Sequence, residues 1–220
     1  MGRVIAFDVN ETLLDLGALD PHFERAFGSA AVREQWFGQM LQLAFVGGLT
    51  RRYVDFGEAQ RAALAMLAER HGVDVDVEEI VGAMSFLPAH DDAAEALDTL
   101  RGAGLPLAAL TNSTLEVARS QLRSAGLADR FDAILSADEV RALKPQCEPY
   151  ELVARTFEVR LRDVRLVAAH AWDIAGAQAA GCAAAFVARP GKVLSPLGEP
   201  PDVIASDLRE VAARIIELDG

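Results

Sequence analysis

Short apolar runs, each bounded by turn residues, recur along the second half of the chain. Stretches of helical periodicity follow them, for example Leu115–Ala125, Pro149–Phe157 and Trp172–Ala180. Together with one run near the start, the predicted strands are Val4–Phe7, Leu107–Leu110, Ala133–Leu135, Leu166–Ala169, Ala183–Val187 and Val203–Ala205. Apolar runs of this length are typical of parallel strands that are buried on both faces and joined by crossover helices. The pattern therefore predicts an α/β fold with a doubly wound, Rossmann-like parallel sheet.

The segment between residues 16 and 90 interrupts this alternation. It has no convincing strand and four stretches of helical periodicity, which are Pro21–Phe27, Val32–Phe45, Gly57–His71 and Val77–Met84. An all-helical block inserted directly after the first strand indicates a cap domain above the carboxyl ends of the strands, where open α/β sheets bind ligands. We therefore expect a core of residues 1–15 and 91–220 and a cap of residues 16–90, with Pro88 near the second junction.

Composition and charge narrow the class of partner. The 220 residues carry a formal net charge of −12, which argues against a nucleic acid or an anionic membrane, because both need a basic footprint. No apolar stretch approaches the roughly 20 residues that span a bilayer. The two cysteines, Cys147 and Cys182, lack metal-type spacing and are expected to be reduced thiols. These features predict a cytoplasmic protein that acts on a small molecule.

Polar residues follow four of the predicted strands or lie in the loops after them. The four groups are Asp8 with Thr12; Thr111, Asn112 and Ser113; Lys144, Pro145 and Tyr150; and His170 with Asp173. Because the carboxyl ends of parallel strands meet at one edge of the sheet, we expect these groups to converge in one crevice. A carboxylate beside a lysine stays ionised and can attack carbon or phosphorus.

In order and spacing, the four groups resemble the four motifs of the haloacid dehalogenase superfamily, in which a helical cap can follow the first motif. The resemblance covers nearly the whole chain. It implies that Asp8 is the nucleophile, that Lys144 orients and neutralises it, and that Asp173 supports the lysine or the attacking water. It also implies that three residues position the substrate or intermediate, namely Thr12, Thr111 and Asn112.

The residues leave milder interpretations open for some of these positions. Thr12 is also a candidate turn residue or helix N-cap, because a threonine hydroxyl often accepts a backbone N–H at the start of a helix. Asn112 is a candidate turn residue, and Tyr150 a candidate for simple packing.

Members of the superfamily that this chain resembles catalyse two main kinds of reaction, phosphoester hydrolysis and dehalogenation. Its magnesium-dependent phosphatases use a second aspartate in the first motif as the general acid, and here that position is Asn10, which cannot give up a proton near neutral pH. A further acidic position of their fourth motif is Ala169 here. Magnesium needs several oxygen ligands, of which Asp8 and Asp173 would remain. Phosphatase chemistry is therefore the alternative rather than the leading hypothesis.

The 2-haloacid dehalogenase (type II) branch is the more similar one. It shares the pair Thr111-Asn112, the tyrosine six residues after the lysine (Tyr150 after Lys144), and an aromatic residue before the last aspartate (Trp172). The resemblance implies a reaction without a cofactor. Asp8 displaces halide from the carbon of a 2-haloacid, and water then hydrolyses the aspartyl ester to give a 2-hydroxyacid.

Three departures from that branch bear on the mechanism. Its cap arginine, which helps to hold the departing halide, aligns with Phe37, and the loss of such a cation costs on the order of 10²–10³ in rate. Three nearby arginines are candidates to replace it, although the preferred interpretation of each is a solvated helix face: Arg33, Arg51 and Arg52. The branch's usual aromatic residue of the first motif is replaced by Asn10, and its serine and asparagine of the fourth motif are replaced by Ala168 and His170.

These departures change the expected site. His170 becomes a candidate base for water, since imidazole suits proton transfer near pH 7, or else a simple hydrogen-bonding partner of Asp8. Asn10, Phe37 and Trp172 join the expected substrate-binding residues.

Two further hypotheses concern function and assembly. The expected site lacks the arginine, the serine and the second acid of its relatives. A third hypothesis is therefore that the protein is a catalytically weak relative that serves as a binding protein. An apolar stripe at helical spacing is expected to be internal packing or pocket lining rather than a dimer seam; it comprises Trp36, Phe37, Leu41 and Phe45. The resemblance nevertheless favours a homodimer, because relatives of the dehalogenase type are commonly dimers. The proline- and glycine-rich stretch of residues 190–201 is expected to be a loop before the last strand, at the sheet edge.

Overall fold

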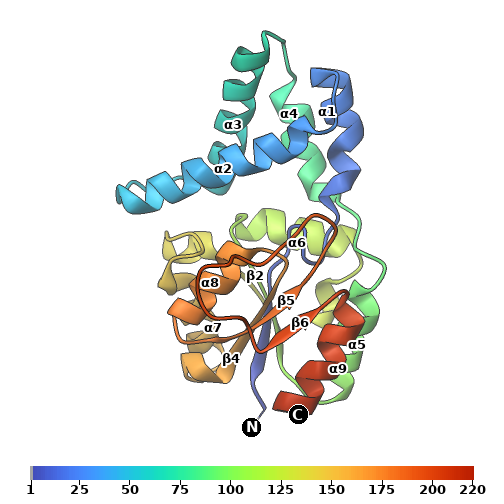
Figure 1. Ribbon diagram of the computed structural model, residues 1–220, viewed down its shortest axis with the longest axis vertical. Helices are drawn as coiled ribbons and strands as arrows, with labels where there is room; N and C mark the ends of the chain where they lie inside the picture. Colours follow the sequence, from blue (N-terminus) through green and yellow to red (C-terminus); the bar gives the residue numbers. More distant parts are fainter. Residues whose placement is uncertain (1) are drawn as a thin grey trace.

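The six strands form one parallel sheet, and the computed structural model describes residues 2–220 (Figure 1). The strands are β1 (Val4–Phe7), β2 (Leu107–Thr111), β3 (Ala133–Ser136), β4 (Val164–Ala168), β5 (Ala183–Val187) and β6 (Val203–Ala205). Their order is β3-β2-β1-β4-β5-β6, and every neighbouring pair is parallel. The predicted α/β fold with a doubly wound parallel sheet is confirmed.

Helices cover both faces of the sheet because successive strand residues bury their side chains on opposite sides. Ile5 and Phe7 of β1 belong to one apolar cluster, and Val4 and Ala6 to the other. The first cluster is covered by α5 (Ala93–Gly102), α6 (Leu115–Ser124) and α9 (Leu208–Asp219), and the second by α7 (Cys147–Thr156) and α8 (Ala171–Ala179). Among residues 2–220, no helix is long and apolar enough to cross a membrane.

The start of β4 differs from the prediction by two residues for a clear physical reason, whereas the ends of β2, β3 and β4 each differ by a single residue. β4 begins at Val164 rather than Leu166, so it includes the charged residue Arg165, which lies outside the predicted apolar run. The side chain of Arg165 is 1% exposed and donates two hydrogen bonds to Asp219 and one to Asp202. A charged side chain can lie inside a sheet when its donors are satisfied in this way.

The helical insertion, residues 16–90, lies beyond the carboxyl ends of the strands in Figure 1. Its α-helices are α1 (Asp20–Phe27), α2 (Val32–Leu49), α3 (Phe56–His71) and α4 (Val77–Ala83), with short 3-10 turns at Leu16–Leu19 and Met84–Phe86. Asp55 and Asp76 cap α3 and α4 by accepting backbone N–H groups with their side chains. No strand lies in this insertion among the described residues, in agreement with the sequence pattern.

Helix α2 is longer than its sequence pattern suggests. It continues past Phe45 through Gly47 and Gly48 to Leu49. A Cβ atom at Gly47 would lie 2.8 Å from the carbonyl oxygen of Arg52, so the glycine there allows the chain to fold back closely against the helix.

The two connections between the insertion and the sheet run side by side. The N–H of Asp15 donates to the carbonyl of Pro88 at 2.8 Å, and the N–H of His90 donates to the carbonyl of Leu13 at 2.9 Å. Leu14 and Ala89 form an antiparallel bridge between them. The division of the chain at residues 15 and 90 stays a prediction, and this pairing is the observation that favours it.

Candidate active site

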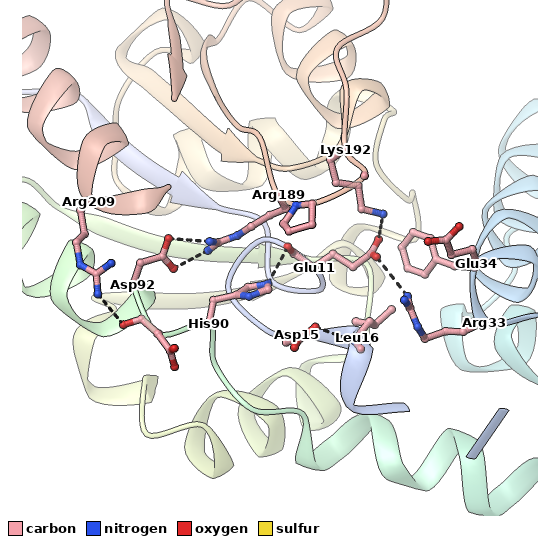
Figure 2. A pocket seen from close by; sticks show the side chains of 15 residues that line it. Glu11, Asp15, Leu16, Arg33, Glu34, His90, Asp92, Arg189, Lys192 and Arg209 are labelled. Atoms are coloured by element: carbon pink, nitrogen blue, oxygen red, sulfur yellow. Dashed lines mark hydrogen bonds and ion pairs between the residues drawn. The ribbon is translucent and has the colours of Figure 1, made fainter. Parts of the chain in front are cut away.

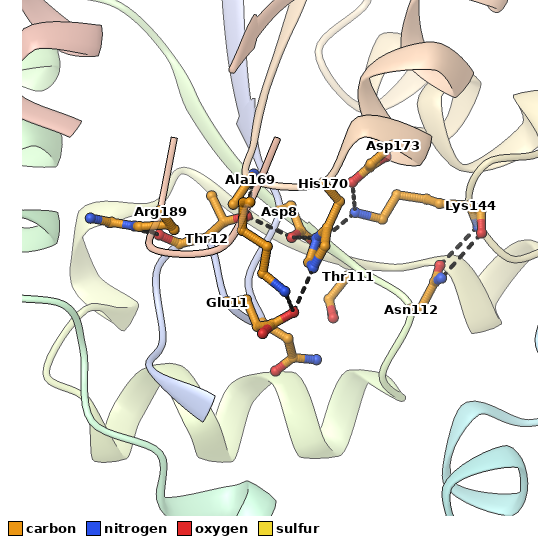
Figure 3. Close-up of polar contacts among 12 residues, drawn as sticks. Asp8, Glu11, Thr12, Thr111, Asn112, Lys144, Ala169, His170, Asp173 and Arg189 are labelled. Atoms are coloured by element: carbon orange, nitrogen blue, oxygen red, sulfur yellow. Dashed lines mark hydrogen bonds and ion pairs between the residues drawn. The ribbon is translucent and has the colours of Figure 1, made fainter. Parts of the chain in front are cut away.

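The candidate site lies where the strand order changes direction. Chain connections leave β1 toward β2 on one side and reach β4 on the other, and this switch point opens a crevice at the carboxyl ends of the strands. Asp8 follows β1 directly, and Ala169 and His170 follow β4. Figure 3 shows these residues beside Lys144 and Asp173, so the groups predicted to converge lie together.

Asp8 is held next to a buried lysine. The Nζ of Lys144 donates to Asp8 Oδ1 at 2.8 Å, and the Lys144 side chain has no exposed surface. Burial by itself raises the pKa of Asp8, but the charge of Lys144 and the hydrogen bond from His170 outweigh it and hold that pKa well below its usual range. Burial lowers the pKa of Lys144, and the charges of Asp173 and Asp8 reverse that effect. Asp8 is therefore ionised across the physiological range and able to act as a nucleophile.

Asp173 holds the lysine from its other side. Its Oδ2 accepts from Lys144 Nζ at 2.5 Å, and its Oδ1 accepts from the hydroxyl of Tyr150 at 2.6 Å. Burial and the negative charge of Asp8 raise the pKa of Asp173, whereas Lys144 opposes that change. Tyr150 is therefore a hydrogen-bonding partner of Asp173 rather than simple packing.

Thr12 fixes the second oxygen of the carboxylate. Its hydroxyl donates to Asp8 Oδ2 at 2.7 Å and accepts the backbone N–H of Ala169 at 3.0 Å. The Thr12 side chain is fully buried, and no helix begins there. Thr12 therefore lies in a turn and is not an N-cap, and its hydroxyl links the loop after β1 to the loop after β4 and orients Asp8.

His170 connects Asp8 to a second buried carboxylate. Its Nδ1 lies 3.2 Å from Asp8 Oδ2, and its Nε2 lies 2.8 Å from Glu11 Oε2. The imidazole is stacked between Phe37 and Trp172, with ring centroids 5.5 Å and 5.3 Å away. Burial lowers the pKa of His170, but hydrogen bonds and charges from Asp8 and Glu11 raise it to about 9. With both carboxylates ionised, the resting imidazole is therefore protonated near neutral pH.

Glu11 is the residue of this site that the sequence motifs did not reveal. It is buried, and its backbone adopts a left-handed conformation with φ 62°, which a non-glycine residue adopts only where the surrounding structure holds it. Burial raises the pKa of Glu11, but hydrogen bonds and charges from His170 and Lys192 lower it below the ordinary value. The available signal was an acidic residue after one strand and a histidine after a neighbouring strand, which a parallel sheet brings together.

The predicted substrate-binding residues after β1 and β2 bond to other parts of the protein. Asn112 donates to the carbonyl of Lys144 at 3.2 Å and accepts its N–H at 2.8 Å, so it fixes the backbone that carries the lysine. Thr111 accepts the N–H of Ser113 at 3.1 Å. Asn10 donates to Ser113 and accepts from Gln121 of α6. A direct contact of Asn10, Thr111 or Asn112 with substrate stays a prediction.

A cavity of about 610 Å³ lies beside this network (Figure 2). Its wall includes Glu11 and Phe37, and two cations from opposite sides approach Glu11 there. Lys192, in the loop after β5, donates to Glu11 Oε2 at 2.7 Å, and Arg33 of α2 lies 3.7 Å from Glu11 Oε1. The expectation that Arg33 is solvated is wrong, because only 14% of its side chain is exposed and it also bonds Asp20.

The donor set does not fit a magnesium ion. Both oxygens of Asp8 already accept hydrogen bonds, from Lys144 on one side and from Thr12 on the other. Both oxygens of Asp173 are bonded as well. The Nζ of Lys144 lies between the two carboxylates, and across residues 2–220 no group of three or more His, Cys, Asp or Glu side chains is arranged to hold a metal. The polar groups of this site therefore bond one another rather than forming a set of metal ligands.

Comparisons with known proteins agree with this geometry. A family model described as haloacid dehalogenase-like hydrolase matches residues 3–181. The (S)-2-haloacid dehalogenase of Pseudomonas sp. (strain YL) is 30% identical over 212 residues, which cover 94% of this chain and 91% of that protein. Haloacetate dehalogenase H-2 of Moraxella sp. (strain B) is 28% identical, over 91% of this chain and 92% of that protein.

A solved structure gives the same result in three dimensions. L-2-haloacid dehalogenase from Xanthobacter autotrophicus, with chloropropionic acid covalently bound, superposes with a TM-score of 0.91. The superposition covers 98% of each chain at 26% sequence identity. The likeness therefore extends over both the sheet and the helical insertion.

Proposed function

The chain belongs to the haloacid dehalogenase-like hydrolases, and from that premise we propose that it is a 2-haloacid dehalogenase that forms an ester on Asp8. The observation that carries the proposal is the ionised Asp8 carboxylate, which Lys144 neutralises on one side and His170 contacts on the other. The names of the relatives favour the (S)-enantiomers of 2-haloacids as substrates. A homodimer and a cytoplasmic location stay predictions.

In the first step, an Asp8 oxygen attacks the carbon that bears the halogen. The new C–O bond forms as the carbon–halogen bond breaks, and the bonding pair leaves with the halide. Lys144 and Thr12 hold Asp8 in place, which lowers the entropic cost of reaching the attacking geometry.

The departing halide needs a hydrogen-bond donor, because Phe37 occupies the position of the cap arginine that helps to hold the halide in the 2-haloacid dehalogenase branch. The indole Nε1 of Trp172 is buried and has no hydrogen-bond partner among residues 2–220. The Trp172 ring stacks on His170 and its centre lies 5.9 Å from Lys144 Nζ, so the ring lies beside two of the residues that bond Asp8. We assign the halide to this N–H, since an unsatisfied buried donor is stabilised by an anion.

Ester formation changes the protonation state of His170. In the resting site, the charges of Asp8 and Glu11 both favour the imidazolium. The ester removes the charge of Asp8, so the pKa of His170 falls and the proton on Nδ1 passes to solvent water. Glu11 then accepts the Nε2–H, and the Nδ1 lone pair points toward the ester. Neutral His170 accepts a proton from the water molecule that attacks the Asp8 carbonyl. The bond between the Asp8 carbonyl carbon and the substrate oxygen then breaks, and the leaving alkoxide takes that proton from His170. This step releases the 2-hydroxyacid and restores the Asp8 carboxylate.

A His170→Ala variant is expected to stop after the first step. Halide should appear in a burst of about one per protein chain, and turnover should then fall about 10²-fold, the usual contribution of a general base. Mass spectrometry of the quenched protein should show the ester on Asp8.

The matched control is His71→Ala, at an exposed histidine of α3, which should turn over like the parent. A His170→Ala protein that turned over at the parent rate, with no accumulated ester, would contradict the role of His170.

The alternative function is a magnesium-dependent phosphoester hydrolase. The experiment that separates the two measures halide release from both enantiomers of 2-chloropropionate and from haloacetates, with EDTA present. We expect release that EDTA does not change, and no phosphate release from p-nitrophenyl phosphate with added magnesium. Magnesium-dependent phosphate release without halide release would establish the alternative. No release of either kind would favour the third hypothesis, a binding relative.

A further inference from the structure

Arg189 is a buried arginine in the loop after β5, and it bonds both a carboxylate and a backbone carbonyl. Its Nη1 donates to Asp92 Oδ2 at 2.7 Å, and its Nη2 donates to Asp92 Oδ1 at 2.8 Å. Its Nε and Nη2 also donate to the carbonyl oxygen of Thr12, at 3.2 Å and 2.8 Å. Only 8% of Arg189 and 4% of Asp92 are exposed. A forked, charge-assisted contact of this kind fixes its partners relative to each other.

Asp92 holds the guanidinium group in the orientation that this contact needs. Its Oδ2 also accepts the backbone N–H of Leu208, the first residue of α9, at 2.8 Å. Burial raises the pKa of Asp92, but the hydrogen bonds from Arg189 and from the Leu208 N–H outweigh it and hold that pKa below its ordinary value. Asp92 is therefore ionised near neutral pH, and the planar guanidinium group presents its Nε edge to Thr12.

Thr12 is the residue that connects Arg189 to the nucleophile. Its carbonyl accepts from Arg189, whereas its hydroxyl donates to Asp8 Oδ2 at 2.7 Å and accepts the N–H of Ala169 at 3.0 Å. A threonine side chain adopts only staggered rotamers, so a fixed Thr12 backbone restricts the positions that its hydroxyl can take. Figure 3 shows Arg189 and Lys144 on opposite sides of Asp8. The carboxylate is therefore held from two directions.

The same contacts join the chain on both sides of the helical insertion. Thr12 lies just before the first connection and Asp92 just after the second, and Arg189 bonds both residues. The two connections also bond each other, as between the N–H of His90 and the carbonyl of Leu13. Arg189 therefore fixes the point where the insertion leaves the sheet, together with the turn that carries Thr12.

We propose that Arg189 is a positioning residue for ester formation: by holding the Thr12 carbonyl, it directs the Thr12 hydroxyl to Asp8 and keeps the carboxylate in its attacking orientation. The inference rests on the proposed function and adds to it a residue that acts through Thr12. The four motif groups do not include Arg189, whose partners lie 177 and 97 positions away in the sequence. Because a misplacement of about 1 Å can cost about 10²-fold in rate, the effect is expected on the rate of attack.

The test is a double-mutant cycle on the rate of ester formation, measured by rapid quench as the halide released in the first turnover of (S)-2-chloropropionate. Arg189→Met is expected to slow this step about 10-fold to 100-fold. Thr12→Val removes the hydroxyl and keeps the shape of the side chain. In the Thr12→Val background, Arg189→Met should slow the step by less than about 3-fold more, because the two residues act as one unit. The matched control is Arg165→Met, which removes another buried, carboxylate-bonded arginine and should leave the rate per folded chain unchanged in both backgrounds.

A second measurement needs no reaction. The backbone N–H of Ala169 donates to the Thr12 hydroxyl, so its hydrogen exchange, followed by NMR, reports whether that hydroxyl stays in place. The reference is the N–H of Ile5, which donates to Pro106 at the start of β1. We expect Arg189→Met to speed exchange at Ala169 about 10-fold more than at Ile5, because the loss of order is local.

Three outcomes would overturn the proposal: an unchanged rate of ester formation in Arg189→Met, an equal loss of rate with and without the Thr12 hydroxyl, or equal acceleration of exchange at Ala169 and Ile5. If the unpaired charge of Asp92 prevents Arg189→Met from folding, the pair Arg189→Met with Asp92→Asn decides in the same way, because it leaves no buried charge unpaired. The exchange measurement does not depend on halide release, so the proposed function and this inference can fail separately.

Discussion

An Asp8→Asn variant is expected to release halide at least about 10⁴-fold more slowly than the parent, because an amide oxygen is a far weaker nucleophile than a carboxylate. The substitution keeps the shape of the side chain and its hydrogen bond from Thr12. Its effect on the fold should therefore be small compared with its effect on the reaction. Ion chromatography of halide released from (S)-2-chloropropionate measures the rate, and Asp8→Ala guards against deamidation back to aspartate.

The matched control for Asp8 is a buried carboxylate at the other end of the sheet. Asp219 of α9 is 8% exposed and bonds Arg165 as well as Arg3, which is near the start of the chain. Asp219→Asn should lower thermal stability and leave halide release per folded chain unchanged. Halide release by Asp8→Ala at a rate near that of the parent would show that Asp8 is not the nucleophile.

A Lys144→Met variant is expected to lose both activity and stability. Without the lysine, Asp8 and Asp173 are two buried carboxylates that face each other, and breaking a buried ion pair costs about 3–5 kcal/mol. One carboxylate then takes up a proton, and the orientation of Asp8 is lost. We expect halide release to fall about 10³-fold, since the nucleophile is both partly protonated and misplaced. Thermal unfolding and halide release on the same preparation measure the two effects.

The Arg165→Met variant is the control for Lys144→Met, because it removes a buried cation that lies outside the candidate active site. Arg165 is as buried as Lys144 and also lies between two carboxylates, Asp219 and Asp202. The Arg165→Met variant should lose about as much stability as Lys144→Met, while its halide release per folded chain should stay near that of the parent. Equal activity losses in both variants would mean that Lys144 acts only through stability.

The sequence predicted the sheet because buried parallel strands have a strong and local signature. Val4–Phe7 and Ala183–Val187 were placed correctly at both ends, since each is an uninterrupted apolar run. β4 was placed two residues late at its start, because the charge of Arg165 is neutralised by Asp219, more than 50 positions away. A pattern that reads only neighbouring residues cannot detect a partner at that distance.

The same distinction holds at the site. The motif residues Asp8, Lys144 and Asp173 could be placed together, because each follows a strand of one parallel sheet. Glu11 and Lys192 could not, because their meeting depends on how two loops fold over the sheet edge. Motif resemblance therefore located the nucleophile and its lysine, and the structure was needed to find the carboxylate that bonds His170.

A single turnover of (S)-2-chloropropionate in H₂¹⁸O, with the protein in excess over the substrate, distinguishes hydrolysis of an Asp8 ester from direct displacement of the halide by water. We expect the heavy oxygen to enter the carboxylate of Asp8, because water attacks the Asp8 carbonyl of the ester, and the hydroxyl group of the lactate to carry none. Peptide mass spectrometry of the segment that contains Asp8, with mass analysis of the lactate, gives both results. Heavy oxygen in the lactate hydroxyl and none in Asp8 would contradict the account, because water would then have displaced the halide without an ester.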